Sequence, residues 1–239
     1  MHIEPGVLDA TKILLSYGTS TAAVLYGANL LRKEIREDAA GPIAGSLTLG
    51  LRSAVATLGT LVFFELLPHF PVGPSEVHFI FGTMLLLFLG AGASTVGLSL
   101  GLLLQALFLS PTDFPQFGAN LTSLLVPLFA TAALARRVTG GRRYVDLRYG
   151  DALKLSLSYQ AGVVGWVAFW VMYGQGVTAL SISSVATFAV AYAPVALLEP
   201  LVDVAALGIA KRFQGRSGGT DGRGSLFVPR LFQSATASN

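Results

Sequence analysis

Long apolar runs separated by short charged clusters dominate the chain. A helix that crosses about 30 Å of hydrocarbon needs about 20 mostly apolar residues, and the runs between the clusters approach this length. The pattern therefore predicts an all-α polytopic membrane protein with about seven transmembrane helices, at residues 8–31, 43–67, 77–91, 94–110, 118–135, 151–174 and 183–209. The third and fourth runs meet at a glycine-rich step, residues 90–92.

Composition supports a membrane protein and narrows the chemistry. Hydrophobic residues make up 53% of the 239 positions and charged residues only 12%, with a mean hydropathy of +0.64, whereas soluble domains carry about 25% charged residues. The absence of cysteine excludes disulfides, thiolate metal sites, iron–sulfur clusters and cysteine nucleophiles. Residues 1–12 contain Glu4 and Asp9 and lack a basic start, so we expect no cleaved signal peptide.

Basic residues are distributed unevenly among the loops. Cytoplasmic loops are enriched in Lys and Arg, and 14 of the 16 basic residues fall in the first loop, the fifth loop and its border, and the segment after the last helix: Arg32, Lys33, Arg36, Arg136, Arg137, Arg142, Arg143, Arg148, Lys154, Lys211, Arg212, Arg216, Arg223 and Arg230. The bias predicts a multi-pass protein of the inner (cytoplasmic) membrane, with the N-terminus outside and anionic lipid at the basic loops. With a net charge of only +3, it does not indicate a nucleic-acid partner.

Two domains follow from this pattern. Residues 1–210 form the seven-helix membrane domain, and residues 211–239 form a tail rich in Gly, Ser and Arg that we expect to be disordered and cytoplasmic.

All three histidines, His2, His69 and His78, fall on the predicted outer side. A histidine at position two offers three successive nitrogens: the Met1 α-amine, the deprotonated His2 amide and the His2 imidazole. Such a nearly planar donor set suits Ni(II) or Cu(II), and Co(II) less strictly, whereas Zn(II) prefers a tetrahedron. An imidazole from His78 or His69 would supply the fourth donor. The alternative is that these histidines are ordinary interfacial residues.

Several sequence blocks resemble one known family, the nickel/cobalt substrate-binding membrane components of energy-coupling-factor transporters (CbiM/NikM type). The blocks are MHI followed by Gly6, FELLPHFPVGPSEVHFIFG at 64–82, LLLQALFL with Gln105, FGAN with Asn120, and AYAPVALLEP at 191–200. The third histidine, His78, aligns with the family's metal-binding histidine. The chain departs from the family at Tyr192 (His in the family), at Pro200 (Gly) and at 110–116, where a glycine-rich turn is replaced.

The resemblance implies a seven-helix subunit that binds Ni(II) or Co(II) as its substrate through Met1, His2 and His78. His69 is an alternative ligand or entry residue, and Asn120 and Gln105 would hydrogen-bond the loops that carry the ligands. No GxxxxGK[ST] phosphate loop is present, so uptake would require ATPase subunits and a transmembrane coupling subunit. The alternative is a non-transporting accessory subunit of a larger membrane complex.

Charged residues inside predicted helices are expensive in a membrane and indicate either pairing or function. Glu199 and Asp203 are four residues apart on one helix, and we expect them to pair with Arg52 or to line a metal path. A membrane enzyme that uses Tyr192, Glu199 and His78 is a third, less favoured hypothesis. We therefore expect no enzymatic activity.

Overall fold

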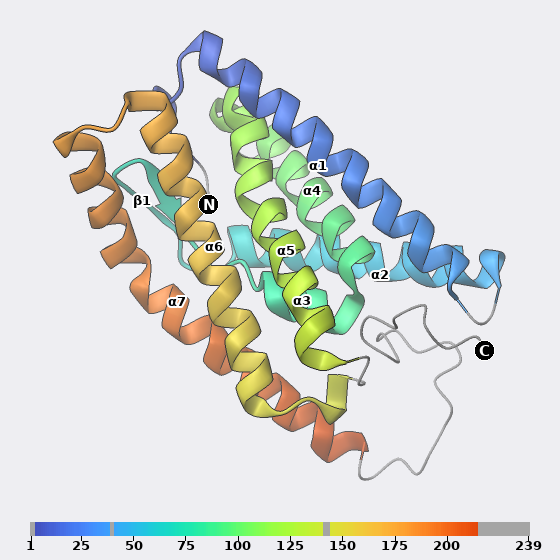
Figure 1. The fold of residues 1–239 in the computed structure, drawn as a ribbon. Coiled ribbons are helices and arrows are strands. Elements are labelled where there is room, and N and C mark those ends of the chain that lie inside the picture. Colours follow the sequence, from blue (N-terminus) through green and yellow to red (C-terminus); the bar gives the residue numbers. More distant parts are fainter. Residues whose placement is uncertain (1–2, 39–40, 141–143, 215–239) are drawn as a thin grey trace.

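The computed structural model describes residues 3–38, 41–140 and 144–214, and nearly all of its regular structure is helical (Figure 1). In chain order the elements are α1 (Ala10–Arg36), α2 (Pro42–Glu65), β1 (Phe70–Val72), β2 (Ser75–Val77), α3 (Gly82–Leu89), α4 (Ala91–Phe108), the 3₁₀ helix η1 (Pro111–Gln116), α5 (Phe117–Thr139), the 3₁₀ helix η2 (Tyr144–Asp146), α6 (Tyr149–Gln175) and α7 (Ala179–Gln214). The prediction of an all-α polytopic membrane protein is confirmed.

Five stretches in the described part of the chain are long and apolar enough to cross a membrane: α2, α4, η1 with α5, α6 and α7. Helix α1 has 27 residues but does not meet the same combination of length and hydropathy. The predicted count of seven crossings is therefore not confirmed. Six of the predicted spans nevertheless correspond to α1, α2, α4, α5, α6 and α7 to within a few residues.

The exception is the predicted span at 77–91. Only Gly82–Leu89 is helical there, and eight residues extend about 12 Å, too short to cross the hydrocarbon. The backbone leaves the right-handed helical region at both ends, with φ of 52° at Phe81 and 92° at Gly90. Because residues 77–91 are almost entirely apolar, their sequence does not distinguish a buried short helix from a full span.

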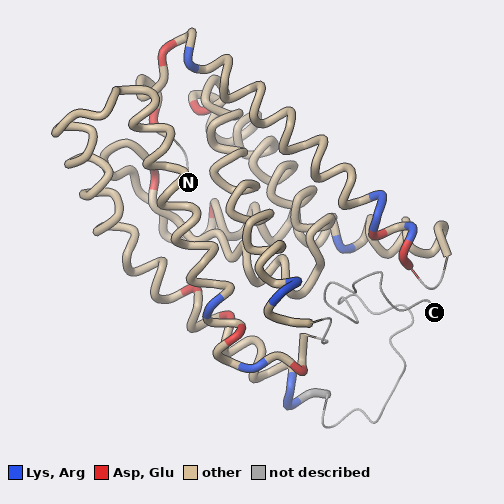
Figure 2. Tube along the Cα trace, in the orientation of Figure 1, with Lys and Arg blue, Asp and Glu red and all other residues tan. Residues whose placement is uncertain are grey.

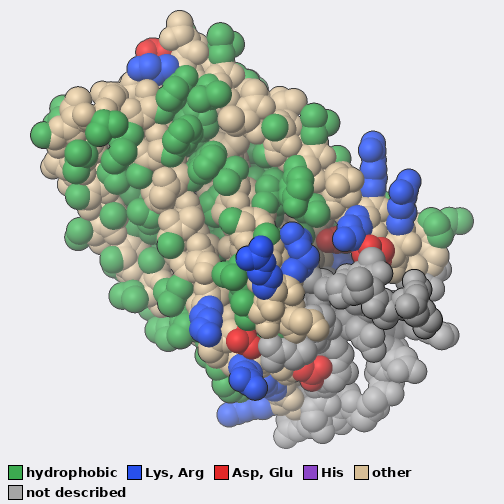
Figure 3. All heavy atoms as spheres, viewed as in Figure 1, with side chains coloured by type: hydrophobic (Ala, Val, Ile, Leu, Met, Phe, Trp, Pro, Cys, Tyr) green, Lys and Arg blue, Asp and Glu red, His purple; other side chains and the backbone are tan. Residues whose placement is uncertain are grey.

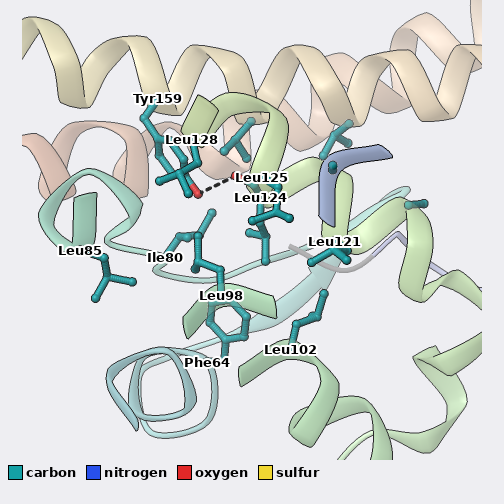
Figure 4. Packing of buried hydrophobic residues seen from close by; sticks show 14 of the residues in the cluster. Phe64, Ile80, Leu85, Leu98, Leu102, Leu121, Leu124, Leu125, Leu128 and Tyr159 are labelled. Atoms are coloured by element: carbon teal, nitrogen blue, oxygen red, sulfur yellow. Dashed lines mark hydrogen bonds between the residues drawn. The ribbon is translucent and has the colours of Figure 1, made fainter. Parts of the chain in front are cut away.

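Helices α2 and α4 approach each other through small residues. A Cβ atom on Gly97 would lie 2.3 Å from the Ala56 Cβ, and one on Gly101 would lie 2.6 Å from the Thr60 side chain. This approach lets Phe64, Leu98 and Leu102 meet Ile80 and the leucines of α5 in the central core (Figure 4). Small interface residues are the usual means of close helix packing in membranes.

The bundle has an apolar side and one strongly basic end. Large hydrophobic side chains such as Leu14 and Ile43 are 71% and 81% exposed, and hydrophobic side chains cover the flank of the molecule (Figure 3). Lys and Arg gather at the end where α1 finishes and α6 starts, whereas the start of α1 carries only Lys12 (Figure 2). The pattern agrees with a lipid-facing flank. Of the predicted tail, residues 211–214 continue α7, and 215–239 lie outside the described residues.

We expect Gly97→Ala to destabilise the bundle by about 1–3 kcal/mol, because the new methyl group overlaps the Ala56 backbone and helices α2 and α4 must separate. Gly165→Ala is the matched control, since nothing lies within 4 Å of its Cβ position in α6. Thermal unfolding in detergent, followed by tryptophan fluorescence, should show a lower midpoint for Gly97→Ala only. Equal midpoints would contradict the assigned α2–α4 contact.

Candidate metal site

The first described residues form a short extended segment that is bonded to the hairpin β1–β2. Ile3 forms an antiparallel bridge with Ser75, and the Glu4 amide donates to the Pro74 carbonyl at 3.0 Å. The Ile3 amide also donates to Asn120 Oδ1 of α5 at 2.6 Å, and the Ile3 side chain is fully buried. The segment at Ile3 and Glu4 is therefore held between the hairpin and α5.

The hairpin positions two of the three histidines. Strands β1 and β2 pair antiparallel with Phe70 opposite Val77, and Gly73 has the positive φ of 61° that the tight turn requires. His69 and His78 consequently lie one residue beyond the paired strands, at the same end of the hairpin. Their environments differ, because His78 is 1% exposed whereas His69 is exposed.

The imidazole of His78 lies in a largely apolar setting. Its ring packs against Phe64 with 4.4 Å between centroids, and its Nδ1 lies 3.0 Å from the Phe79 carbonyl oxygen. In the tautomer with hydrogen on Nδ1, that contact is a hydrogen bond, and Nε2 carries the lone pair that a metal would take. His69 Nδ1 lies 3.2 Å from the Leu67 carbonyl oxygen on the surface.

Of the predicted ligands only His78 can be located, because Met1 and His2 lie outside the described residues. Within the described ranges, no group of three or more His, Asp or Glu side chains could hold a metal ion. The segment just before α1 has an acidic surrounding: partial burial raises the pKa of Glu4, and the carboxylates of Asp113 and Glu76 raise it further. The Glu4 carboxyl therefore lies near two further acidic side chains.

Glu199 connects α7 to the backbone that follows His78. One carboxylate oxygen accepts from the Ile80 amide, and the other accepts from the Phe81 amide at 3.0 Å. Gln160 of α6 donates to the same carboxylate at 2.6 Å and accepts from the Tyr192 hydroxyl at 2.5 Å. We call these three side chains, Glu199, Gln160 and Tyr192, the brace. It holds the irregular segment between β2 and α3.

The other predicted polar contributors divide into two groups. Asn120 holds the N-terminal segment through Ile3, which is the type of contact expected of it. Gln105 instead donates to Glu65 Oε1 at 2.6 Å, at the end of α2. The structure thus links Asn120, but not Gln105, directly to the segment next to the predicted ligands.

The expected pairing of Glu199 and Asp203 with Arg52 is wrong. Arg52 has Glu34 and Asp38 as its electrostatic neighbours, and Glu34 accepts a hydrogen bond from the Gly92 amide at 2.8 Å, near the start of α4. A carboxylate at a helix N-terminus is favourable because the free amide groups are partly positive there. The sequence did not predict that Glu34 and Gln160 make these buried hydrogen bonds. For Gln160, the one available signal was an isolated amide side chain within a mostly apolar helix.

Comparisons with known proteins agree with this arrangement. The sequence matches the family described as CbiM, cobalt uptake substrate-specific transmembrane region, over residues 2–216. No curated protein matches the chain.

Two solved structures share the fold. A structure described as a transition metal transporter has a TM-score of 0.64 and 17% identity, covering 92% of this chain and 100% of its own. A truncated transition metal transporter has a TM-score of 0.61 and 17% identity, covering 90% and 99%. The family match spans most of the sequence, and its blocks include the segment fixed at Ile3 and the hairpin that ends at His78. The chain therefore belongs to the CbiM family of cobalt-uptake transmembrane proteins, which are transporters and not enzymes.

Proposed function

We propose that this protein is the substrate-binding membrane component of an energy-coupling-factor transporter for Ni(II) or Co(II). The Met1 amine, the His2 amide and imidazole, and the His78 imidazole would hold the ion in a nearly planar set of four nitrogens. The observation that carries the proposal is the antiparallel bridge between Ile3 and Ser75.

The direction of this bridge supports the proposed set of donor atoms. In an antiparallel pair, moving from Ile3 toward the chain start corresponds to moving from Ser75 toward Val77 and His78. Two residues extend at most about 7 Å, and the Ile3 amide is anchored by Asn120. These short spans favour an arrangement in which an amine at the chain start and the buried His78 ring would bind one ion together.

Burial favours tight binding by this donor set. His78 is held between Phe64 and the Phe79 carbonyl, so its ring loses little freedom when it binds a metal. A four-nitrogen plane favours Ni(II), with Cu(II) as an alternative and Co(II) acceptable. His69, exposed at the same end of the hairpin, is placed to meet an arriving ion rather than to hold it.

Transport by this protein depends on other subunits. The sequence has no nucleotide-binding loop, so ATPase subunits and a transmembrane coupling subunit would supply the energy. The basic end of the bundle would face the cytoplasm and its anionic lipids, with the N-terminus outside the inner membrane.

Adding one glycine before Met1 should abolish stoichiometric metal binding, because the α-amine becomes an amide and the chelate loses its terminal donor. The matched control adds one glycine after Asn239. Metal content after equilibration with Ni(II) or Co(II), measured by mass spectrometry, should fall only in the N-terminal variant, with the thermal unfolding midpoint unchanged. Equal metal content in both variants would reject the amine as a ligand.

Replacing His78 should weaken Ni(II) or Co(II) binding by at least about 10–100-fold, and replacing His69 should have a smaller effect. His78→Phe is preferable to alanine, because it preserves the ring packing against Phe64 and removes only the donor nitrogen. Equilibrium titration of folded His78→Phe and His69→Phe measures the ranking. The opposite ranking would make His69 the fourth ligand.

The orientation is testable because the chain contains no cysteine. A Ser217→Cys protein in sealed cells should resist an impermeant thiol reagent and react after the membrane is permeabilised. Thr178→Cys, in the turn between α6 and α7 at the opposite end, should react in intact cells. The reverse pattern would reject an external N-terminus and, with it, an external metal site.

A further inference from the structure

Polar side chains continue along α6 and α7 beyond the brace, toward the basic end of the bundle. Helices α6 and α7 pack antiparallel, so Ser156 lies one turn from Gln160 and Asp203 lies one turn from Glu199 in the same direction. One helical turn advances about 5.4 Å. The brace is therefore followed by a second polar level, Ser156 with Asp203.

This second level is buried and unsatisfied. Asp203 is 2% exposed and Ser156 is fully buried. Among the described residues, neither carboxylate oxygen of Asp203 has a hydrogen-bond partner. The same is true of the Ser156 hydroxyl. The Ser156 hydroxyl lies close to the carboxylate, without hydrogen-bond geometry between them.

Among the described residues, the surroundings of Asp203 are mostly apolar. Leu155 precedes Ser156 on α6, and Leu207 lies one turn beyond Asp203 on α7. Both leucines are fully buried in a cluster with Leu87. No described Lys or Arg forms an ion pair with Asp203. An unpaired buried carboxylate costs several kcal/mol, so a function is the simplest reason for its presence.

The chemistry of this level suits a divalent cation. Asp203 supplies two oxygen donors and Ser156 supplies a third. Glu199 lies one turn away and supplies a second negative charge, so the two carboxylates together match the 2+ charge of the ion. Oxygen donors bind Co(II) more weakly than a four-nitrogen chelate does, which is what a transient site requires. The level also lies between the segment that follows His78 and the 3₁₀ helix η2, whose Tyr144 is electrostatically coupled to Asp203.

We propose that Asp203 and Ser156 form a second, weaker cation site that receives the transported divalent ion after it leaves the N-terminal chelate. The role in transport rests on the function proposed above, whereas the binding site itself can be tested separately. Glu199 belongs to both levels: it accepts the Ile80 and Phe81 amides, and its charge adds to that of Asp203.

The test uses full-length protein in detergent, equilibrated with saturating Co(II) chloride. Four proteins are compared: native, Gly-extended at the N-terminus, Asp203→Asn, and the combination. We expect two, one, one and zero bound Co(II) ions per chain. Ser156→Ala should weaken the second site about tenfold, whereas Ser99→Ala, which removes another buried hydroxyl without a partner, should have no effect.

The four stoichiometries separate the two proposals. One ion in the native and Asp203→Asn proteins and none in the Gly-extended protein would overturn the second site and leave the chelate intact. One ion in the native and Gly-extended proteins and none in Asp203→Asn would support the second site and reject the chelate.

Transport supplies an independent readout. In cells that contain the complete transporter, Asp203→Asn should lower Co(II) uptake at least about tenfold while the affinity of the N-terminal site is unchanged. Unchanged uptake with a folded Asp203→Asn protein would show that Asp203 is a passive buried acid and would overturn its role in transport.

Discussion

The non-helical backbone inside this bundle depends on hydrogen bonds from side chains on distant helices. Within a membrane protein, an amide without a partner costs several kcal/mol, and irregular backbone survives only where the protein itself satisfies it. Here Asn120 accepts from Ile3, Glu34 from Gly92, and Glu199 from both Ile80 and Phe81. Each bond joins residues at least 58 positions apart in the chain.

These bonds explain how the short hairpin and the segment at Ile3 are held in place inside the bundle. The hairpin has only three residues in each strand, which is too short to be stable alone. Ile3 extends it on one side, and the brace fixes the backbone immediately after it. The brace joins the backbone that follows His78 to α6 and α7, both of which reach the basic end.

The sequence predicts the helices well and the site only in part. Apolar runs of about 20 residues place six helices, and the break at Gly90 is correctly expected, because both depend on local composition. The eight-residue α3 and the bridge from Ile3 to Ser75 depend on contacts made after folding, and their local sequences do not encode them. The resemblance pointed to Asn120, which contacts the N-terminal segment through Ile3, and to His78, whose role as a ligand stays a prediction. It gave no indication that Glu199 would bind backbone amides rather than Arg52.

The position of Arg52, away from Glu199 and Asp203, affects the distribution of charge inside the bundle. A pairing with Arg52 would offset only one of the two negative charges of Glu199 and Asp203. Instead Arg52 lies near Glu34 and Asp38, and no described Lys or Arg forms an ion pair with Glu199 or Asp203. An ion leaving a nitrogen chelate near His78 would then meet carboxylate oxygens before it met a positive charge. Arg136 and Arg137 lie in the last turn of α5, at the basic end of the bundle, and their charge would oppose the passage of a cation toward that end.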